Sequence, residues 1–293
     1  MGKDMLYSDR DLGKLIVPLI IEQTLAIAVG MADTIMISVA GEAAVSGVSL
    51  VDTVNILLIN VFSALATGGA VVSGHFLGQK RREDASRAGW QIILFATSLA
   101  LAITVAFIGF HAGLLRLMFG QIEPDVMRSA RIYLIITAVS FPGLAVYNSC
   151  AAIFRAMNSA KVTMWISLLI NAVNLIGNAV CIFGLKWGVA GAAVPTAVSR
   201  YVGAVLIFYL MFNEKREINF CGQVRFRFDL ELIKRILFIA IPNGLENSMF
   251  QLGKILVLSL VATMGTSAIA ANAVGGTLAG WNILFPDTLF DSR

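Results

Sequence analysis

Charged side chains are scarce in this sequence. Asp, Glu, Lys and Arg make up 14% of its 293 residues, whereas soluble domains carry about 25%. Hydrophobic residues make up 58%, and the mean hydropathy is +0.82. Apolar stretches as long as the roughly 20 helical residues that cross a bilayer recur along the chain. These features exclude an ordinary soluble domain and predict an all-α integral membrane protein.

Cysteine and histidine are also few. The three cysteines are Cys150 and Cys181 in apolar stretches and Cys221 in a basic connection. Their spacing predicts neither a disulfide framework nor a metal site. The two histidines, His75 and His111, stand near predicted span ends with no Cys or acid at ligand spacing. An intramembrane enzyme would need a nucleophile with its base, or metal ligands, at helical spacing. The sequence therefore does not predict an enzyme.

The apolar segments predict seven membrane spans and most of an eighth. The connections between them are short, so neighbouring spans are expected to be antiparallel. The predicted spans are Leu12–Val39, Gly47–Gly74, Trp90–Leu115, Ile132–Phe154, Thr163–Leu185, Val189–Phe212, Leu237–Val261 and Ala268–Phe285.

Basic residues are distributed unequally between the two ends of these spans. Fifteen Lys and Arg fall on the side of the amino terminus, and four fall on the other side, namely Arg116, Arg128, Arg131 and Lys186. The positive-inside rule then predicts a multi-pass protein of the plasma membrane with a cytoplasmic amino terminus. The same asymmetry accounts for the net charge of +4, so no nucleic-acid partner is predicted.

Part of the pattern recurs at a constant offset of 224 residues. Pro18, Glu22, Gly41 and Ala44 correspond to Pro242, Glu246, Gly265 and Ala268. An even number of spans per copy makes two copies parallel, a common construction of transporters. We predict a six-helix amino-terminal lobe (residues 1–212), a basic cytoplasmic linker (213–235) and the first one to two helices of a second, incomplete lobe (236–293). A complete second lobe would bring the protein to about 440 residues, so we expect this chain to be a fragment or a truncated product.

Two acids stand inside the first span. Glu22 and Asp33 are 11 residues apart, which returns to within about 20° of the same helix face. An ionisable group at the middle of the bilayer costs about 2.5 to 3.5 kcal/mol on insertion scales. Both carboxyl groups are therefore expected to face a protein interior or a water-filled cavity. For Glu22, a structural role beside the backbone opened by Pro18 remains an equal alternative.

Three asparagines form a stripe on the fifth span. Asn171, Asn174 and Asn178 stand at i, i+3 and i+7, within about 60° of one another. Amides can hydrogen-bond a carboxylic acid or coordinate a hard cation. Facing Asp33, they would form an ion-exchange site. The alternative is that they only join helices, as polar residues in membrane helices often do.

Three further ionisable residues fall within or near predicted spans. Asp52 is expected to be interfacial, near the outer end of the second span. Arg200 and Lys254 are intramembrane by position, and Lys254 could extend to the interface or pair with an acid across the lobes. Because Val257 stands where the repeat would place an equivalent of Asp33, the ion site is expected to belong to the first lobe.

Several short motifs of this sequence, taken together, resemble the motifs of one protein family. The resemblance is to the multidrug and toxic compound extrusion (MATE) family, especially its prokaryotic, DinF-like branch. The residues that carry it, in chain order, are Pro18, Glu22-Gln23, Met31-Ala32-Asp33-Thr34-Ile35-Met36-Ile37-Ser38, Gly41-Glu42-Ala43-Ala44, Gly78-Gln79, Phe154-Arg155-Ala156-Met157-Asn158-Ser159, Asn174, Asn178 and Gly188-Val189-Ala190-Gly191-Ala192-Ala193.

The resemblance implies a secondary active multidrug exporter that exchanges drug for H⁺ or Na⁺ by alternating access. It implies a proton or cation site at Asp33, Asn174 and Asn178, which would act as metal ligands only with Na⁺. To the ion-coupling set we add Glu22 and Asn171, and as substrate-cavity residues we predict Glu246, Gln23 and Tyr147. No cofactor besides the coupling ion is expected. The expected partners are small, organic, cationic substrates and the lipid bilayer, with a monomer as the full-length state.

Two alternatives stay open at this point. A lipid-linked saccharide flippase has a related architecture, but its cavity would need many Arg and Lys side chains for pyrophosphate. Here only Arg200 and Lys254 are available within the spans. The second alternative is a non-transporting fragment, because the later spans of the second lobe are missing from the sequence.

Overall fold

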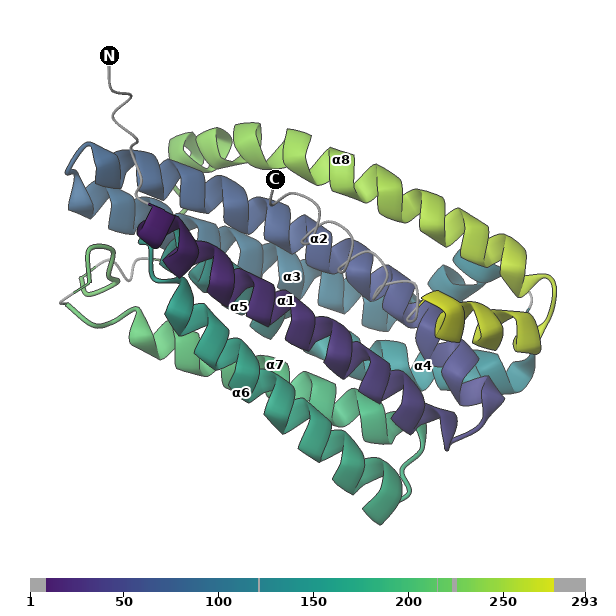
Figure 1. Ribbon diagram of the computed structural model, residues 1–293. Helices are drawn as coiled ribbons and strands as arrows, with labels where there is room; N and C mark the ends of the chain where they lie inside the picture. The colour runs from purple at the N-terminus through teal and green to yellow at the C-terminus, as the bar shows by residue number, and fades with distance from the viewer. Residues whose placement is uncertain (1–8, 121, 215, 223–225, 277–293) are drawn as a thin grey trace.

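The computed structural model describes residues 9–120, 122–214, 216–222 and 226–276, and in these ranges the chain is helical without strands. Figure 1 shows long helices that run side by side in one bundle. They are α1 (Asp9–Ser38), α2 (Glu42–Gly78), α3 (Arg82–Phe119), α4 (Pro124–Val139), α5 (Phe141–Ala156), α6 (Ala160–Ala179) with a π-helical turn η1 (Val180–Gly184), α7 (Val189–Leu210) and α8 (Leu230–Ala262), and residues 266–276 are also helical.

Helix α2 occupies the centre of the bundle. It packs against α3, α4, α5 and α8, while α1 lies along α6, and α6 pairs with α7. Helix α8 crosses the bundle on α2, on the side away from α6 and α7 (Figure 1). Gly68 permits this approach, because a Cβ atom there would lie 2.6 Å from the backbone oxygen of Ile236 in α8.

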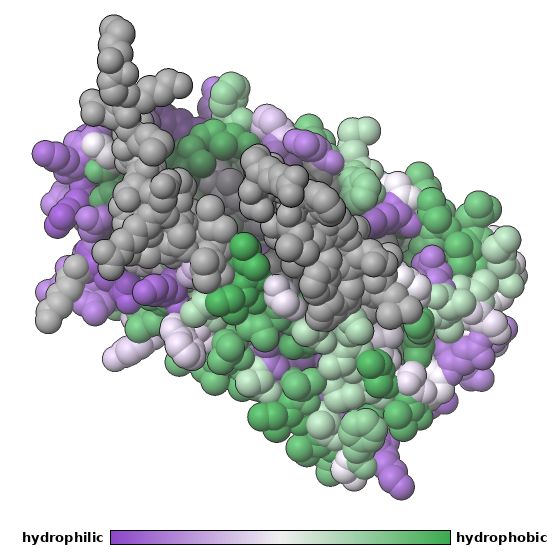
Figure 2. Space-filling view, in the orientation of Figure 1, coloured by the Kyte–Doolittle hydropathy of each residue, from purple (hydrophilic) through white to green (hydrophobic). Residues whose placement is uncertain are grey.

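The predicted fold class is confirmed. Six helices of the described chain are long and apolar enough to cross a membrane, and the bent pair α4 and α5 would make a seventh span. Large hydrophobic side chains such as Trp165, Ile176 and Val205 are about 64% exposed on α6 and α7. In Figure 2 the flank formed by α6 and α7 is largely hydrophobic, as a lipid-facing surface would be. The predicted eighth span, Ala268–Phe285, lies outside the described residues from position 277 onward.

The fourth predicted span differs from the structure. Instead of one helix over Ile132–Phe154, the chain forms two helices. Helix α4 starts at Pro124, and it meets α5 at a 49° bend beside Ser140. The cause is Pro142, which has no N–H to donate to the carbonyl of Ala138.

The carbonyls freed at this bend are satisfied by neighbouring helices. The hydroxyl of Thr104 in α3 donates to the oxygen of Ala138 at 2.9 Å, and the hydroxyl of Tyr201 in α7 donates to Val139 at 2.6 Å. These bonds allow a broken helix at membrane depth, where unsatisfied backbone groups are costly.

The two copies of the predicted repeat turn in the same way. Gly41 after α1 has φ of +102°, and Gly265 after α8 has φ of +106°. In both turns this glycine's carbonyl accepts from the N–H four residues later, Val45 at 3.2 Å and Ile269 at 3.3 Å. Only glycine adopts this conformation without strain. The shared geometry supports a parallel repeat, while the boundaries of the lobes at 212 and 236 stay a prediction.

The segment between α7 and α8 is anchored on α3. The amide of Gln91 donates to the carbonyl of Arg227 at 2.8 Å and accepts from the N–H of Asp229 at 3.0 Å. Asp229 also forms an ion pair with Arg87 at 2.6 Å and caps α8 by accepting from the N–H of Leu232. Because of this cap, α8 begins at Leu230, seven residues before the predicted start of the seventh span.

Candidate functional site

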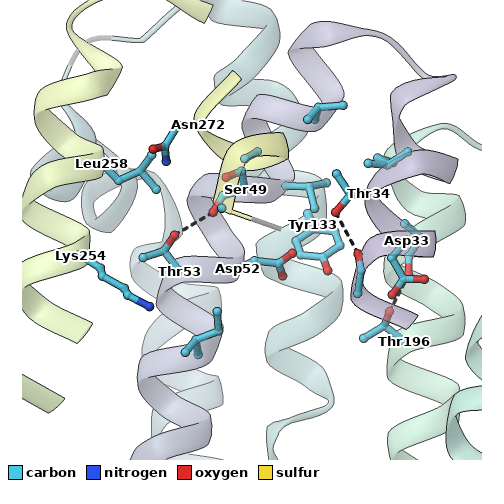
Figure 3. Close-up of a pocket in the computed structure, with 18 of the residues that line it drawn as sticks. Asp33, Thr34, Ser49, Asp52, Thr53, Tyr133, Thr196, Lys254, Leu258 and Asn272 are labelled. Carbon is cyan, nitrogen blue, oxygen red and sulfur yellow. Dashed lines mark hydrogen bonds between the residues drawn. The ribbon is translucent and has the colours of Figure 1, made fainter. Parts of the chain in front are cut away.

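A cavity of about 440 Å³ lies at the end of the bundle where α1 turns into α2. Figure 3 shows side chains from several helices pointing into it. Its walls come from α1, α2, α4, α6, α7, α8 and residues 266–276. The lining residues are Ile27, Gly30, Asp33, Thr34, Ile37, Val45, Val48, Ser49, Asp52, Thr53, Ile56, Tyr133, Asn178, Ala192, Thr196, Lys254, Leu258, Asn272, Ala273 and Gly276.

Asp33 is held on the α1 wall by amides of α6. The amide nitrogen of Asn178 donates to Asp33 Oδ1 at 2.7 Å. Asn174, one turn earlier, is buried beside it, with its amide 3.2 Å from the amide nitrogen of Asn178. Parallel packing of α1 on α6 brings these residues together, so the predicted proximity of Asp33 to Asn174 and Asn178 is found in the structure. Their role in ion coupling stays a prediction.

The Asn174 amide fits its position in two orientations. In one, its nitrogen donates to the hydroxyl of Thr196 in α7 at 3.0 Å. In the other, its nitrogen lies 3.2 and 3.3 Å from the two oxygens of Asp33, and its oxygen accepts from Thr196 at 3.0 Å. We favour the second orientation, because an ionised carboxylate can only accept hydrogen bonds. In that orientation Asn174 and Asn178 both donate to Asp33.

Asp52 belongs to the cavity, contrary to the interfacial position expected from the sequence. It lies on α2 with hydrogen bonds from Tyr133 and from Asn55, the latter at 3.3 Å. The charge of Arg200 lies nearby, and Arg200 donates to the hydroxyl of Ser140 at 2.9 Å. The bend between α4 and α5 thus places Ser140 where it holds Arg200.

A sequence signal for Asp52 was present. Ser49, Asp52, Thr53 and Ile56 recur at helical spacing on α2, and all four line the cavity. Thr196 was also missed. Its hydroxyl lies four residues after Ala192 on the same face of α7, and both residues line the same wall.

The repeat relates the two walls of the cavity. Five pairs of lining residues are separated by the offset of 224, namely Gly30 and Lys254, Thr34 and Leu258, Val48 and Asn272, Ser49 and Ala273, and Asp52 and Gly276. Equivalent positions of both copies therefore face the same space. The cavity lies between the repeats, where transporters with internal repeats bind their substrates.

Glu22 lies in a separate polar cluster. Its carboxylate is 3.9 Å from the guanidinium of Arg155 in α5 and hydrogen-bonded to Thr163 at the start of α6. The predicted cavity residue Tyr147 belongs to the same neighbourhood, where it contacts Ser167 and the charges of Glu22 and Arg155. Glu22 and Asp33 both face α6, as their spacing predicts, but they serve different clusters.

Two further predicted site residues, Asn171 and Glu246, do not line the cavity as the structure describes it. Asn171 is half-buried on α6, and Glu246 is exposed on α8. The side chain of Gln23 lies outside the described residues. For these three positions, the predicted ion-coupling or substrate role rests on the sequence alone.

The Asp33 side of the cavity has the chemistry of a proton or cation site. A carboxylate, two amides and a hydroxyl converge there, and the carbonyl oxygen Asn178 Oδ1 is buried without a hydrogen-bond partner in the described chain. Oxygen donors of these kinds suit a proton or a hard cation such as Na⁺.

A helical bundle whose predicted repeats border one cavity, with apolar walls and a few polar groups, is typical of a membrane transporter. A family model described as MatE matches residues 18–180, more than half of the sequence. The chain belongs to the MatE family. Because this is a family of transporters, an intramembrane enzyme is excluded.

Relatives with curated descriptions agree with this membership. The "Uncharacterized transporter YisQ" of Bacillus subtilis is 26% identical over 273 residues, which cover 92% of this chain and 59% of YisQ. The "Probable multidrug resistance protein NorM" of Thermotoga maritima is 26% identical over 270 residues, which cover 91% of this chain and 57% of NorM. The chain thus spans less than two thirds of the length of these relatives.

Solved structures share the fold. An inward-facing multidrug resistance MATE family transporter superposes with a TM-score of 0.79 at 22% identity, covering 90% of this chain and 60% of that one. A MATE crystal structure in the straight conformation gives a TM-score of 0.81 at 20% identity, covering 94% and 61%. The predicted fold of a MATE transporter is therefore confirmed.

Proposed function

We propose that this chain acts in a secondary active multidrug efflux transporter that exchanges drug for H⁺ or Na⁺ across the plasma membrane. The observation that carries the proposal is Asp33, held by Asn178 and Asn174 on the wall of the cavity between the repeats. Membership in the MatE family and the description of NorM as a "Probable multidrug resistance protein" support it.

Asp33 is the coupling residue in this proposal. A proton or Na⁺ neutralises its carboxylate, and the free oxygen of Asn178 offers a further acceptor beside it. A ligand shifts a conformational equilibrium only by its different affinities for the two states. In this proposal the coupling ion and the substrate both bind at Asp33. The ion stabilises one opening of the cavity and the substrate stabilises the opposite opening, so that the two are carried across the membrane in opposite directions.

The cavity sets the substrate class. Two carboxylates, Asp33 and Asp52, stand among apolar side chains such as Ile27, Val48 and Leu258. Small amphipathic compounds with a cationic group fit this lining, since ligand pockets combine apolar walls with few polar groups. We propose that the full-length protein works as a monomer with its amino terminus in the cytoplasm.

A lipid-linked saccharide flippase remains the alternative. Its pyrophosphate substrate would need several Arg or Lys side chains. Among the described lining residues, Lys254 is the single basic one, and Arg200 lies beside Asp52 instead. The charge of the cavity therefore favours an exporter of small molecules.

The test is dye efflux from everted vesicles that contain the protein, energised with either a pH gradient or a Na⁺ gradient. We expect the wild-type protein to export a fluorescent cationic dye with one of the two gradients. Asp33→Asn should abolish the gradient dependence, whereas Asp125→Asn, which changes an exposed acid at the start of α4, should not. Full coupled efflux by the Asp33→Asn variant would refute the role of Asp33.

A further inference from the structure

Lys254 is a lysine on α8 whose side chain points into the cavity. It lines the wall opposite the acids of α1 and α2, and Figure 3 shows its amine directed toward the space that Asp52 and Tyr133 also border. It stands eight residues before the end of α8, well within a helix long and apolar enough to span the membrane. A charged residue at such a depth is a candidate functional group.

Within the described chain, Lys254 has no carboxylate partner. Its ammonium lies over the ring of Phe250 on the same helix, 4.8 Å from the nitrogen to the ring centroid. That contact holds the side chain without neutralising its charge.

The two acids across the cavity already accept hydrogen bonds from other residues of the first lobe. Asp33 accepts from Asn178, and from Asn174 in the orientation we favour. Asp52 accepts from Tyr133 and Asn55 and lies near the charge of Arg200. The ammonium of Lys254 is thus left facing the cavity rather than an acid of the first lobe.

The predicted repeat shows that the two walls of the cavity differ in charge. Lys254 corresponds to Gly30 of the first copy, and Val257 corresponds to Asp33. The first copy therefore contributes acids to the shared cavity, and the second contributes a cation where the first has no side chain. Two equivalent walls have acquired opposite charges.

We propose that Lys254 is an anion subsite that binds the carboxylate of amphipathic zwitterionic substrates. The cationic group of such a substrate lies toward Asp33, whose amide partners Asn178 and Asn174 carry no charge, and its carboxylate pairs with the Lys254 ammonium on the opposite wall. A cavity of about 440 Å³ has the volume of a small-molecule site. This inference rests on the proposed export function and names its substrate class.

The test compares two rhodamine dyes that differ by one methyl group. One has a free carboxylate beside its cationic ring system, and the other is its methyl ester, which lacks the negative charge. Binding to the purified protein is measured by fluorescence anisotropy, which requires no transport. The variants are Lys254→Gln, Lys254→Met and Lys254→Arg, with Lys234→Gln as the control, because Lys234 is exposed on the same helix away from the cavity.

We expect Lys254→Gln to weaken binding of the carboxylate dye by about tenfold, equivalent to about 1.4 kcal/mol, and binding of the ester by less than about twofold. Lys254→Arg and Lys234→Gln should bind both dyes as the wild type does. If Lys254→Gln fails to fold, Lys254→Met, which keeps the apolar stem, makes the same comparison.

If Lys254→Gln weakened the binding of both dyes equally, or weakened the binding of neither, the anion subsite would be overturned. Efflux of the two dyes from everted vesicles separates this result from the proposed function. A protein that binds the carboxylate dye through Lys254 but exports neither dye would keep the subsite and refute the export function.

Discussion

The bond between Asn178 and Asp33 is the shortest contact of the candidate ion site. Its 2.7 Å length and its burial at the interface of α1 and α6 are those of a charge-assisted hydrogen bond. Asn171 stands seven residues earlier on the same helix, is half-buried, and makes no side-chain hydrogen bond to the part of the chain that the structure describes. The two asparagines are therefore a matched pair that separates a site residue from a residue of the same type outside the site.

Asn178→Ala should lower the free energy of unfolding in detergent by about 1 to 2 kcal/mol, because Asp33 loses a donor in a buried position. Asn171→Ala should lower the free energy of unfolding by less than about 0.6 kcal/mol. Thermal or SDS-induced unfolding followed by circular dichroism measures both. Equal losses in the two variants would contradict the assignment of Asn178 to the Asp33 site.

At the scale of the helices, the contact of α8 with α2 connects the two repeats. Gly68 faces α8, where an added Cβ would lie 2.6 Å from the oxygen of Ile236 and 3.0 Å from the Cβ of Ala240. Gly74, less than two turns further along α2, has its nearest neighbour at 3.9 Å, the Cβ of Ala156. The backbone of α8 cannot yield at Gly68 without a shift of the helix.

Gly68→Ala and Gly74→Ala should change stability in opposite directions. At Gly74 alanine improves helix propensity and fits, so the free energy of unfolding should rise by about 0.5 to 1 kcal/mol. At Gly68 the clash should lower it by about 1 to 3 kcal/mol. Unfolding of the purified variants measures the two signs, and stabilisation by Gly68→Ala would show that α8 does not pack there as described.

At the scale of the whole molecule, the basic connections gather at one end. The turn between α2 and α3 and the segment before α8 lie at the end where α1 begins, while the start of α4 lies at the other end (Figure 1). The positive-inside rule then predicts that the first end is cytoplasmic. Glu217 and Glu123 are exposed side chains, one at each end.

Single cysteines at these two positions should therefore label differently. In a background with Cys150, Cys181 and Cys221 replaced by alanine, Glu123→Cys should react with a membrane-impermeant maleimide in intact cells. Glu217→Cys should react only after the cells are permeabilised. The reverse pattern would refute a cytoplasmic amino terminus, and labelling of both positions in intact cells would show leaky cells or mixed orientation.

Much of this fold could be predicted because a bilayer imposes simple rules. Hydropathy alone identifies helices that cross it, and the recurrence of Pro18, Glu22 and Gly41 at Pro242, Glu246 and Gly265 indicates a repeat. The proximity of Asp33 and the asparagines of α6 was also predictable. A buried carboxylate needs donors, and residues spaced by three and four share one helix face.

The sequence by itself determined the class of the protein and most of its helices, and it indicated a repeat and the residues that we propose for an ion site. Only the tertiary structure decided that α4 and α5 bend at Ser140, that Asp52 lies in the cavity and that Lys254 faces it. The physical reason is that helix periodicity relates residues within one helix. The orientation of each helix face is set by close packing, as where Gly68 admits α8, and by partners from other helices, as where Thr104 and Tyr201 satisfy the carbonyls at the bend.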